Sequence, residues 1–156
     1  MKKTPIVAGN WKMNKLPSEG SSYVFEISKL VKDIKAVEVI YAPPFTGLFD
    51  LKVKPPFHIA AQNCHWEDWG ALTGEISLKM IKDCGAEYVI LGHSERRHIF
   101  NETDEWVNNK VRAVLSNDLK PILCIGETIE QRENGDTKSI LENQLEKGLS
   151  SIEEIN

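Results

Sequence analysis

Residues Val89–Arg97 read VILGHSERR and place a histidine at the point where a short apolar run ends. The stretch Val7–Asn14, VAGNWKMN, has the same design, with an asparagine and a lysine after the apolar residues. A short apolar run is typical of a buried strand, and parallel sheets carry functional groups just beyond the C-terminal ends of their strands. The two stretches therefore predict two strands, with Asn10, Lys12 and His93 as candidate functional residues.

Similar apolar runs recur along the whole chain, with helical patterns between them. The runs are continuous rather than alternating, as in parallel strands covered on both faces, and they span Pro5–Ala8, Val37–Ala42, Phe57–Ala61, Tyr88–Leu91 and Pro121–Ile125. Apolar residues at helical spacing predict helices beginning near Ser18, Thr103 and Thr137, and shorter helical turns at Phe45–Leu51 and Ser77–Cys84. Alternating strands and helices predict an α/β protein with a parallel sheet.

Two of the predicted helices carry an apolar stripe that we expect to face the core. The helix after Thr103 has Trp106, Val107, Val111, Val114 and Leu115 on one stripe. The helix after Thr137 has Ile140, Leu141, Leu145, Leu149 and Ile152. Gly85 is expected to cap the helical turn that precedes it, because glycine readily adopts the left-handed conformation at a helix end.

Length and charge restrict the class of protein. A chain of 156 residues predicts a single domain, residues 1–156, and a net charge of −4 argues against nucleic acid as a partner. No run of 18 apolar residues occurs, so no membrane partner is expected. Cys64, Cys84 and Cys124 are odd in number and far apart, which indicates reduced thiols and a cytoplasmic location.

Five strand–helix units fit either an open doubly wound sheet or part of a (β/α)8 barrel. In both architectures, residues directly after the strands lie at one edge of the sheet. Asn10, Lys12, His93 and Glu127 all have that position. Their shared placement favours a functional reading over a chance distribution.

His93 has a plain structural reading, in which it caps a strand end and bonds to the backbone. The functional reading is favoured because Ser94–Arg97 could begin a helical turn directly after it. Backbone N–H groups of such a turn, pointed at the ring, disfavour the imidazolium form. A neutral imidazole at this position could donate a hydrogen bond or a proton to a carbonyl oxygen.

Lys12 and Asn10 are weaker candidates when each is taken alone. Most lysines are surface residues, but one at the end of a parallel strand could hold a cation near an anionic substrate. The amide of Asn10 could bind the same substrate oxygen. The long connection Gln62–Glu75 has no clear helical period, and connections of this length in compact domains are usually functional or bind a partner.

The sequence predicts no metal and no cofactor. His58, His65 and His98 belong to no ligand set with metal-binding spacing, and the cysteines form no pair. Neither G-x-G-x-x-G nor the phosphate-binding G-x-x-x-x-G-K-[ST] pattern occurs.

Taken together, VAGNWKMN, AQNC, ALTGEIS, ILGHSERR, ILCIGET and EQRENGDT resemble the triosephosphate isomerase family in order and spacing. The resemblance runs from the first predicted strand to about Glu146. It implies an incomplete (β/α)8 barrel, made of the first five strands and helices. It also implies interconversion of dihydroxyacetone phosphate and D-glyceraldehyde 3-phosphate through an enediolate, in glycolysis and gluconeogenesis, without metal or cofactor.

The resemblance also assigns roles to individual residues. Asn10 and Lys12 resemble residues that contact the phosphorylated triose, with Lys12 as the cation near the phosphate and the developing oxyanion. His93 resembles the neutral electrophile, a property already known for that family, and Glu95 resembles a supporting carboxylate that interacts with the lysine. The connection that contains Thr73 and Glu75 resembles the loop that inserts into the partner subunit of a homodimer.

Two features depart from the family pattern. In the loop, Leu72 stands where an aromatic residue is common, and Trp69 stands where a small or polar residue is expected. A barrel of this kind usually needs about 250 residues. The family's catalytic glutamate, closing loop and glycine-rich phosphate-binding segments have no counterpart before Asn156, so the 156 residues alone are predicted to be inactive.

Other readings stay open. Glu127 is the best alternative candidate for the missing base, although its family counterpart is structural. A non-enzymatic fragment that keeps the Gln62–Glu75 loop could instead assemble with a full-length subunit. An unrelated doubly wound regulator or nucleotide-binding domain is the third reading, and Asn10-Trp11-Lys12 does not supply the phosphate site that it needs.

Overall fold

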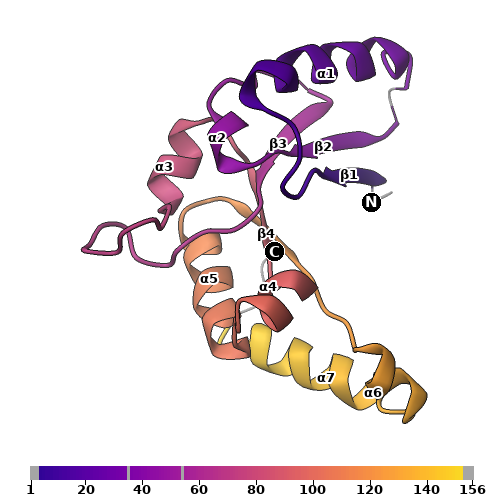
Figure 1. The fold of residues 1–156 in the computed structure, drawn as a ribbon, viewed down its shortest axis with the longest axis vertical. Coiled ribbons are helices and arrows are strands. Elements are labelled where there is room, and N and C mark those ends of the chain that lie inside the picture. The colour runs from indigo at the N-terminus through magenta and orange to yellow at the C-terminus, as the bar shows by residue number, and fades with distance from the viewer. Residues whose placement is uncertain (1–3, 35, 54, 153–156) are drawn as a thin grey trace. The chain divides into compact units, whose positions relative to one another are not determined.

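Strands and helices alternate in the computed structural model, which describes residues 4–34, 36–53 and 55–152 (Figure 1). The elements are β1 (Ile6–Asn10), α1 (Pro17–Leu30), β2 (Glu38–Ala42), α2 (Phe45–Leu48), β3 (Phe57–Ala61), α3 (Leu78–Asp83), β4 (Tyr88–Leu91), α4 (Ser94–Ile99), α5 (Asp104–Ser116), β5 (Lys120–Leu123), α6 (Ile129–Glu133) and α7 (Thr137–Gly148). The sheet order is β1-β2-β3-β4-β5, and the pairs β1–β2, β2–β3 and β3–β4 are parallel. The predicted parallel α/β fold is therefore confirmed.

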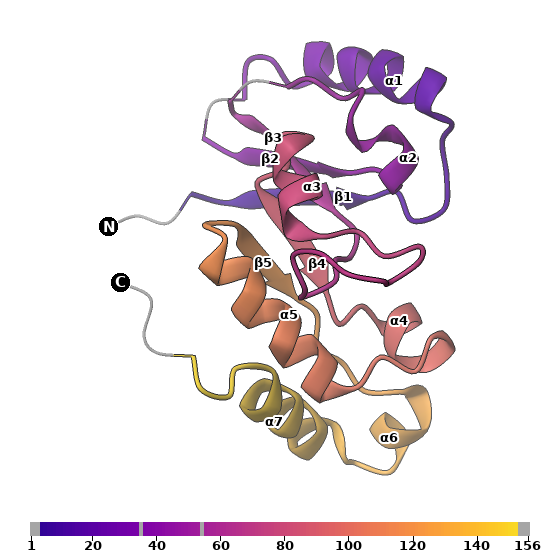
Figure 2. The same cartoon turned by 90° about the vertical axis from the view of Figure 1, so that its left-hand side faces the viewer.

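The chain divides into two compact units, residues 1–89 and 90–156, so that the division falls within β4. In the first unit, β1, β2 and β3 are in register from Ile6↔Glu38 to Tyr41↔Ile59, and Asn10 pairs with Ala42. Helix α1 runs along one face of these strands (Figure 2). The largest fully buried side chains of this unit include Ile40, Leu48, Leu51, Leu78 and Ile81.

In the second unit, α5 lies beside α7 and also packs on β5 (Figure 2). The hydroxyl of Thr103 accepts a hydrogen bond from the Trp106 N–H at 3.2 Å, so the predicted N-cap is confirmed. Val107, Val111 and Val114 are buried as predicted, whereas Trp106 is 45% exposed. Among the described residues, no helix combines the length and apolar character that a membrane crossing requires.

Helix α1 begins one residue before the predicted cap. Pro17 is the first helical residue, and Ser18 lies within the first turn. Proline is favoured at this position because its missing N–H would have no helical partner. The carboxylate of Glu19 accepts a hydrogen bond from the Leu16 N–H at 2.8 Å, which fastens the helix start without the Ser18 hydroxyl.

The buried face of α7 also differs from the prediction. Gln144 and Gly148 are buried, while Leu145 is 39% and Leu149 is 46% exposed. Both buried residues meet the segment around β5. The Gln144 side chain bonds to the Gly126 backbone, and a Cβ atom on Gly148 would lie 3.4 Å from the Leu123 side chain. Polar pairing and close approach therefore orient this helix.

The segment after β5 contains two further differences. β5 ends at Leu123, two residues before the predicted end, and α6 follows where no helix was predicted. Thr128 begins α6 with reciprocal bonds. Its hydroxyl accepts from the Gln131 N–H at 3.3 Å, and the Gln131 Oε1 accepts from the Thr128 N–H at 2.9 Å. The pattern T-x-x-Q is typical of a helix N-terminus, but no helix was predicted from it.

Candidate functional site

Asn10 and Lys12 lie at the C-terminal end of β1, as the sequence predicts. Lys12 has a φ of 53°, in the left-handed region that only glycine and a few polar residues adopt readily. The Asn10 Oδ1 accepts a hydrogen bond from the Lys12 N–H at 2.9 Å. Asn10 therefore shapes the backbone that carries the lysine, in addition to any contact its amide makes with a ligand.

Gln62, directly after β3, is a third residue of this group. Its Nε2 donates to the Lys12 carbonyl oxygen at 2.9 Å and to the Ala42 carbonyl oxygen at 2.8 Å. Sequence reasoning placed Gln62 only at the start of a loop and gave it no role. Its position directly after a parallel strand was the signal that could have found it.

His93 lies between β4 and α4 and caps the helix, so the predicted helical turn after it is confirmed. Its Nδ1 lies 3.3 Å from the backbone nitrogen of Glu95 and also 3.3 Å from that residue's carboxylate Oε2. The backbone N–H needs a bare Nδ1 lone pair, whereas the carboxylate would need a proton on Nδ1. The Glu95 side chain is 42% exposed and can turn away, but its backbone N–H cannot. The geometry thus favours the tautomer whose proton lies on Nε2.

The turn before His93 is held tightly by Arg97. The Arg97 Nε donates to the Gly92 carbonyl oxygen at 2.7 Å, and its Nη1 lies 2.6 Å from the Asp104 Oδ1. Gly92 has a φ of 66°, and a Cβ atom there would lie 2.9 Å from the Arg97 Nη2 and 3.1 Å from the Cys124 carbonyl oxygen. No larger residue fits at Gly92 without displacing the guanidinium.

A buried charge cluster fastens α4 to α5. The Glu102 carboxylate is completely buried, and its Oε1 contacts the Lys110 ammonium directly and the Arg96 Nε at 3.3 Å. Lys110 is also buried, with 3% of its side chain exposed, although the apolar pattern gave no sign of a lysine on the inner face of α5. This cluster stabilises the helix that begins at His93.

The Gln62–Glu75 loop ends in a tight turn that carries Thr73. The Glu75 N–H bonds to the Leu72 carbonyl oxygen at 3.1 Å, and Gly74 has the positive φ of 92° that such a turn requires at its third position. Thr73 and Glu75 are both exposed.

The remainder of the loop is braced by α3. The Lys79 Nζ lies 2.8 Å from the Asp68 Oδ2 and 5.4 Å from the centre of the Trp69 ring. The ring of His65 stacks on Trp66 at 4.2 Å.

Glu127 is engaged with its own neighbours. Its Oε1 accepts a hydrogen bond from the Thr137 hydroxyl at 3.3 Å, and only 15% of its side chain is exposed. These contacts support a structural role at the junction of β5 and α7 over a role as a base. Nearby, burial raises the pKa of the Cys124 thiol and the Arg97 guanidinium partly offsets that rise, which argues against a nucleophile.

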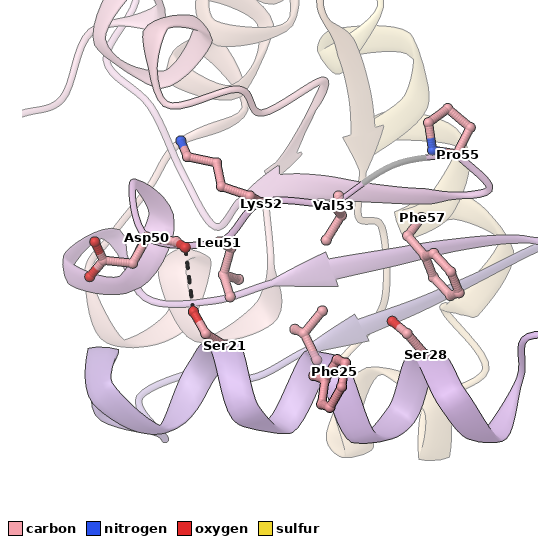
Figure 3. Close-up of a pocket in the computed structure, with 10 residues that line it drawn as sticks. Ser21, Phe25, Ser28, Asp50, Leu51, Lys52, Val53, Pro55 and Phe57 are labelled. Atoms are coloured by element: carbon pink, nitrogen blue, oxygen red, sulfur yellow. Dashed lines mark hydrogen bonds between the residues drawn. The ribbon is translucent and has the colours of Figure 1, made fainter.

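The cavity drawn in Figure 3 does not coincide with these residues. It has a volume of about 500 Å³ and lies between α1 and the segment that leads into β3 (Figure 3). A second cavity of about 400 Å³ is lined by Asn10 and Trp11, together with side chains of α1 and β2. Within the described ranges, no group of three or more His, Cys, Asp or Glu side chains is arranged to hold a metal ion.

The predicted residues fall into two groups, one in each compact unit. In the first unit, Lys12 is hydrogen-bonded to both Asn10 and Gln62. In the second unit, His93 lies against Glu95. Parallel βα repeats in the consecutive strand order β1-β2-β3-β4-β5 are typical of the βα-barrel class of protein, in which polar residues directly after the strands form the functional face.

Comparison with known proteins specifies the family within that class. The family model for triosephosphate isomerase matches residues 5–156, and the chain belongs to that family. It is 51% identical over 153 residues to the triosephosphate isomerase of Caldanaerobacter subterraneus subsp. tengcongensis, covering 96% of this chain and 61% of that protein. It is 44% identical over 152 residues to that of Aquifex aeolicus, covering 96% and 62%.

Solved structures agree. The crystal structure of triosephosphate isomerase from Bartonella henselae superposes with a TM-score of 0.89 at 36% sequence identity, covering 97% of this chain and 64% of that one. The resemblance to the family and the incomplete (β/α)8 barrel are confirmed, and the open doubly wound alternative is set aside. The chain spans about 60% of the length of the curated relatives described here.

Proposed function

We propose that the protein acts in the interconversion of dihydroxyacetone phosphate and D-glyceraldehyde 3-phosphate. Asn10, Lys12, His93 and Glu95 supply the electrophilic part of the site. The observation that carries the proposal is the placement of His93. A backbone N–H engages its Nδ1, which leaves Nε2 as the proton-bearing nitrogen for a substrate oxygen. Family membership supports the choice of reaction.

The proposed mechanism assigns each residue one task. A carboxylate base removes a proton from the carbon next to the carbonyl group, and negative charge develops on the carbonyl oxygen. The His93 Nε2–H donates to that oxygen and moves protons between the two oxygens of the enediolate. Lys12 supplies a fixed positive charge near the phosphate and the oxyanion, Asn10 contacts the same substrate, and Glu95 supports the lysine.

The base is proposed to lie outside these 156 residues. Glu127 is held by Thr137, and Glu95 lies at the Nδ1 side of His93, so neither is placed as a base by the described contacts. The 156 residues alone are therefore expected to show no turnover above buffer. Turnover that a Glu127→Gln substitution abolished would contradict this assignment.

A chimera tests the electrophile directly. In it, residues 1–156 replace the matching part of the Caldanaerobacter enzyme, which is 51% identical. We expect isomerisation by the chimera and a loss of roughly 10²–10⁴-fold in kcat for His93→Gln, the range typical of general acid–base groups. His98→Gln is the matched control, because His98 lies exposed on the same helix and should leave kcat unchanged. Equal rates for the two variants would contradict the proposed role of His93.

We further propose that the whole protein is a cytoplasmic homodimer in which these residues form one domain with the rest of the barrel. The bracing of the Gln62–Glu75 loop by Lys79 supports a preformed contact for a second subunit, with Thr73 at the tip. The same observation supports a second candidate function, in which the chain is a non-enzymatic module that assembles with a full-length subunit. Co-purification with intact isomerase without added turnover would favour the module, and no association would exclude it.

A further inference from the structure

Lys12 has a backbone conformation that a lysine does not adopt by preference. Its φ of 53° brings Cβ close to the following carbonyl group, which disfavours this region for most residues other than glycine. Such a conformation persists only where the surroundings hold it. The orientation of the Lys12 side chain depends on it, because a return to negative φ would turn the Cα–Cβ bond to a different direction.

The contacts that hold this conformation come from both sides of the residue. On the N-terminal side, the Asn10 Oδ1 accepts from the Lys12 N–H at 2.9 Å. On the C-terminal side, the Gln62 Nε2 donates to the Lys12 carbonyl oxygen at 2.9 Å. The same Nε2 also donates to the Ala42 carbonyl oxygen at 2.8 Å, and this oxygen accepts a further hydrogen bond from the Trp11 N–H at 3.0 Å.

This arrangement determines which way the Gln62 amide points. Both of its neighbours are carbonyl oxygens, so an Oε1 in that place would find no donor from either of them. One NH₂ group has two hydrogens and meets two acceptors, one at residue 12 and one at the end of β2. Gln62, at the end of β3, thereby joins the ends of three neighbouring strands around Lys12.

We propose that Gln62 is a positioning residue for the isomerisation, acting through Lys12 by holding its backbone in the left-handed conformation. The inference rests on the proposed function for its catalytic meaning, whereas the coupling between Gln62 and Lys12 holds independently of it. Gln62 needs no contact with the substrate. Its role is to orient the ammonium group of Lys12.

Nuclear magnetic resonance of the chain tests this coupling directly. At positive φ the amide hydrogen and Hα of one residue approach closely and give a strong intraresidue cross-peak. We expect that cross-peak for Lys12 in the wild type and a clear weakening in Gln62→Met and Gln62→Glu, which keep the side-chain length but remove both donors. A Lys12 cross-peak of unchanged strength in both variants would overturn the inference.

Two comparisons separate positioning from a general loss of structure. Gln144→Met is the matched control, because Gln144 also clamps a backbone group, the Gly126 peptide, but lies away from Lys12 in the chain. It should leave the Lys12 cross-peak intact. In Gln62→Glu, lowering the pH protonates the introduced carboxyl and restores one O–H donor, so the cross-peak should recover in part. If the cross-peak does not recover in a variant whose other resonances match the wild type, the result would count against the proposed positioning of Lys12 by Gln62.

Turnover distinguishes this inference from the proposed function. In the chimera described above, Gln62→Met should lower kcat/KM by about 10²-fold, the loss expected when a binding group is misplaced by about 1 Å. Gln144→Met should change it much less. An inactive chimera would contradict the proposed function and leave the Lys12 cross-peak to decide the inference. An active chimera that is unaffected by Gln62→Met would overturn the positioning role.

Discussion

The Nδ1 of His93 lies 3.3 Å from the backbone nitrogen of Glu95, so the imidazole ring itself caps helix α4. A ring held in this way presents a lone pair to the helix and keeps its proton on the opposite nitrogen. The contact between His93 and Glu95 at the start of the helix thus determines which nitrogen can donate. Tautomer and orientation come from one contact.

We expect nitrogen NMR of the protein at neutral pH to show the His93 Nδ1 as a bare acceptor and Nε2 as protonated. Glu95→Gln should not change this result, because the backbone N–H of residue 95 remains in place. His98, exposed on the same helix, provides the reference spectrum. A protonated Nδ1 that becomes bare in Glu95→Gln would show instead that the carboxylate controls the tautomer.

The buried cluster of Glu102, Lys110 and Arg96 predicts strong coupling between two substitutions. Glu102→Gln or Lys110→Met alone should lower the free energy of unfolding by roughly 3–5 kcal/mol, because each removes the nearest opposite charge from a buried charge. The double variant should lose less than the sum, by about 2 kcal/mol. Urea denaturation of the four proteins measures this cycle, and additive losses would contradict direct pairing.

Lys79 is predicted to control the order of the Gln62–Glu75 loop rather than global stability. Its ion pair with Asp68 is half exposed, so Lys79→Met should change the free energy of unfolding by at most about 1 kcal/mol. The loop should nevertheless be cleaved several-fold faster by a protease, since Trp69 also loses its cationic neighbour.

Lys138→Met provides a matched control for the Lys79 experiment. It removes a more exposed ion pair, with Glu142 on α7, and it should leave loop cleavage unchanged. Faster cleavage of the loop in both variants would show that Lys79 has no specific effect.

The Cys84 thiol is predicted to react slowly with alkylating reagents, and one substitution is expected to make this reaction faster. Burial raises the pKa of Cys84, the Asp83 carboxylate raises it further, and Lys52 opposes them in part. A raised pKa means less thiolate at a given pH, so alkylation should be slower than for an unperturbed cysteine and should speed up only at higher pH.

Asp83→Asn removes one of the two causes that raise the Cys84 pKa, the other being burial. It should therefore shift the pH profile of alkylation to lower pH, as measured by mass spectrometry of the labelled peptide. Cys124, where burial dominates and Asp83 is not a cause of the shift, should be unaffected. An unchanged profile for Cys84 would exclude the Asp83 contribution.

Much of the fold could be predicted because it depends on local patterns. The strands Phe57–Ala61 and Tyr88–Leu91 have the predicted bounds, and Thr103 caps its helix as expected. The errors occur where a long-range contact overrides a local pattern. The inner face of α7 carries Gln144 because that side chain bonds to Gly126, and apolar spacing cannot anticipate such a pair.

The candidate site likewise has one part that the sequence determined and another that only the tertiary structure showed. The sequence alone determined which residues follow the strands, so Asn10, Lys12 and His93 were found from their positions and from the family motifs. Only the tertiary structure showed that Gln62 reaches Lys12 across fifty residues of chain and that Lys110 lies buried against Glu102. The physical reason is that residue order specifies where a strand ends. Hydrogen bonds and ion pairs between distant segments exist only after the strands have come together.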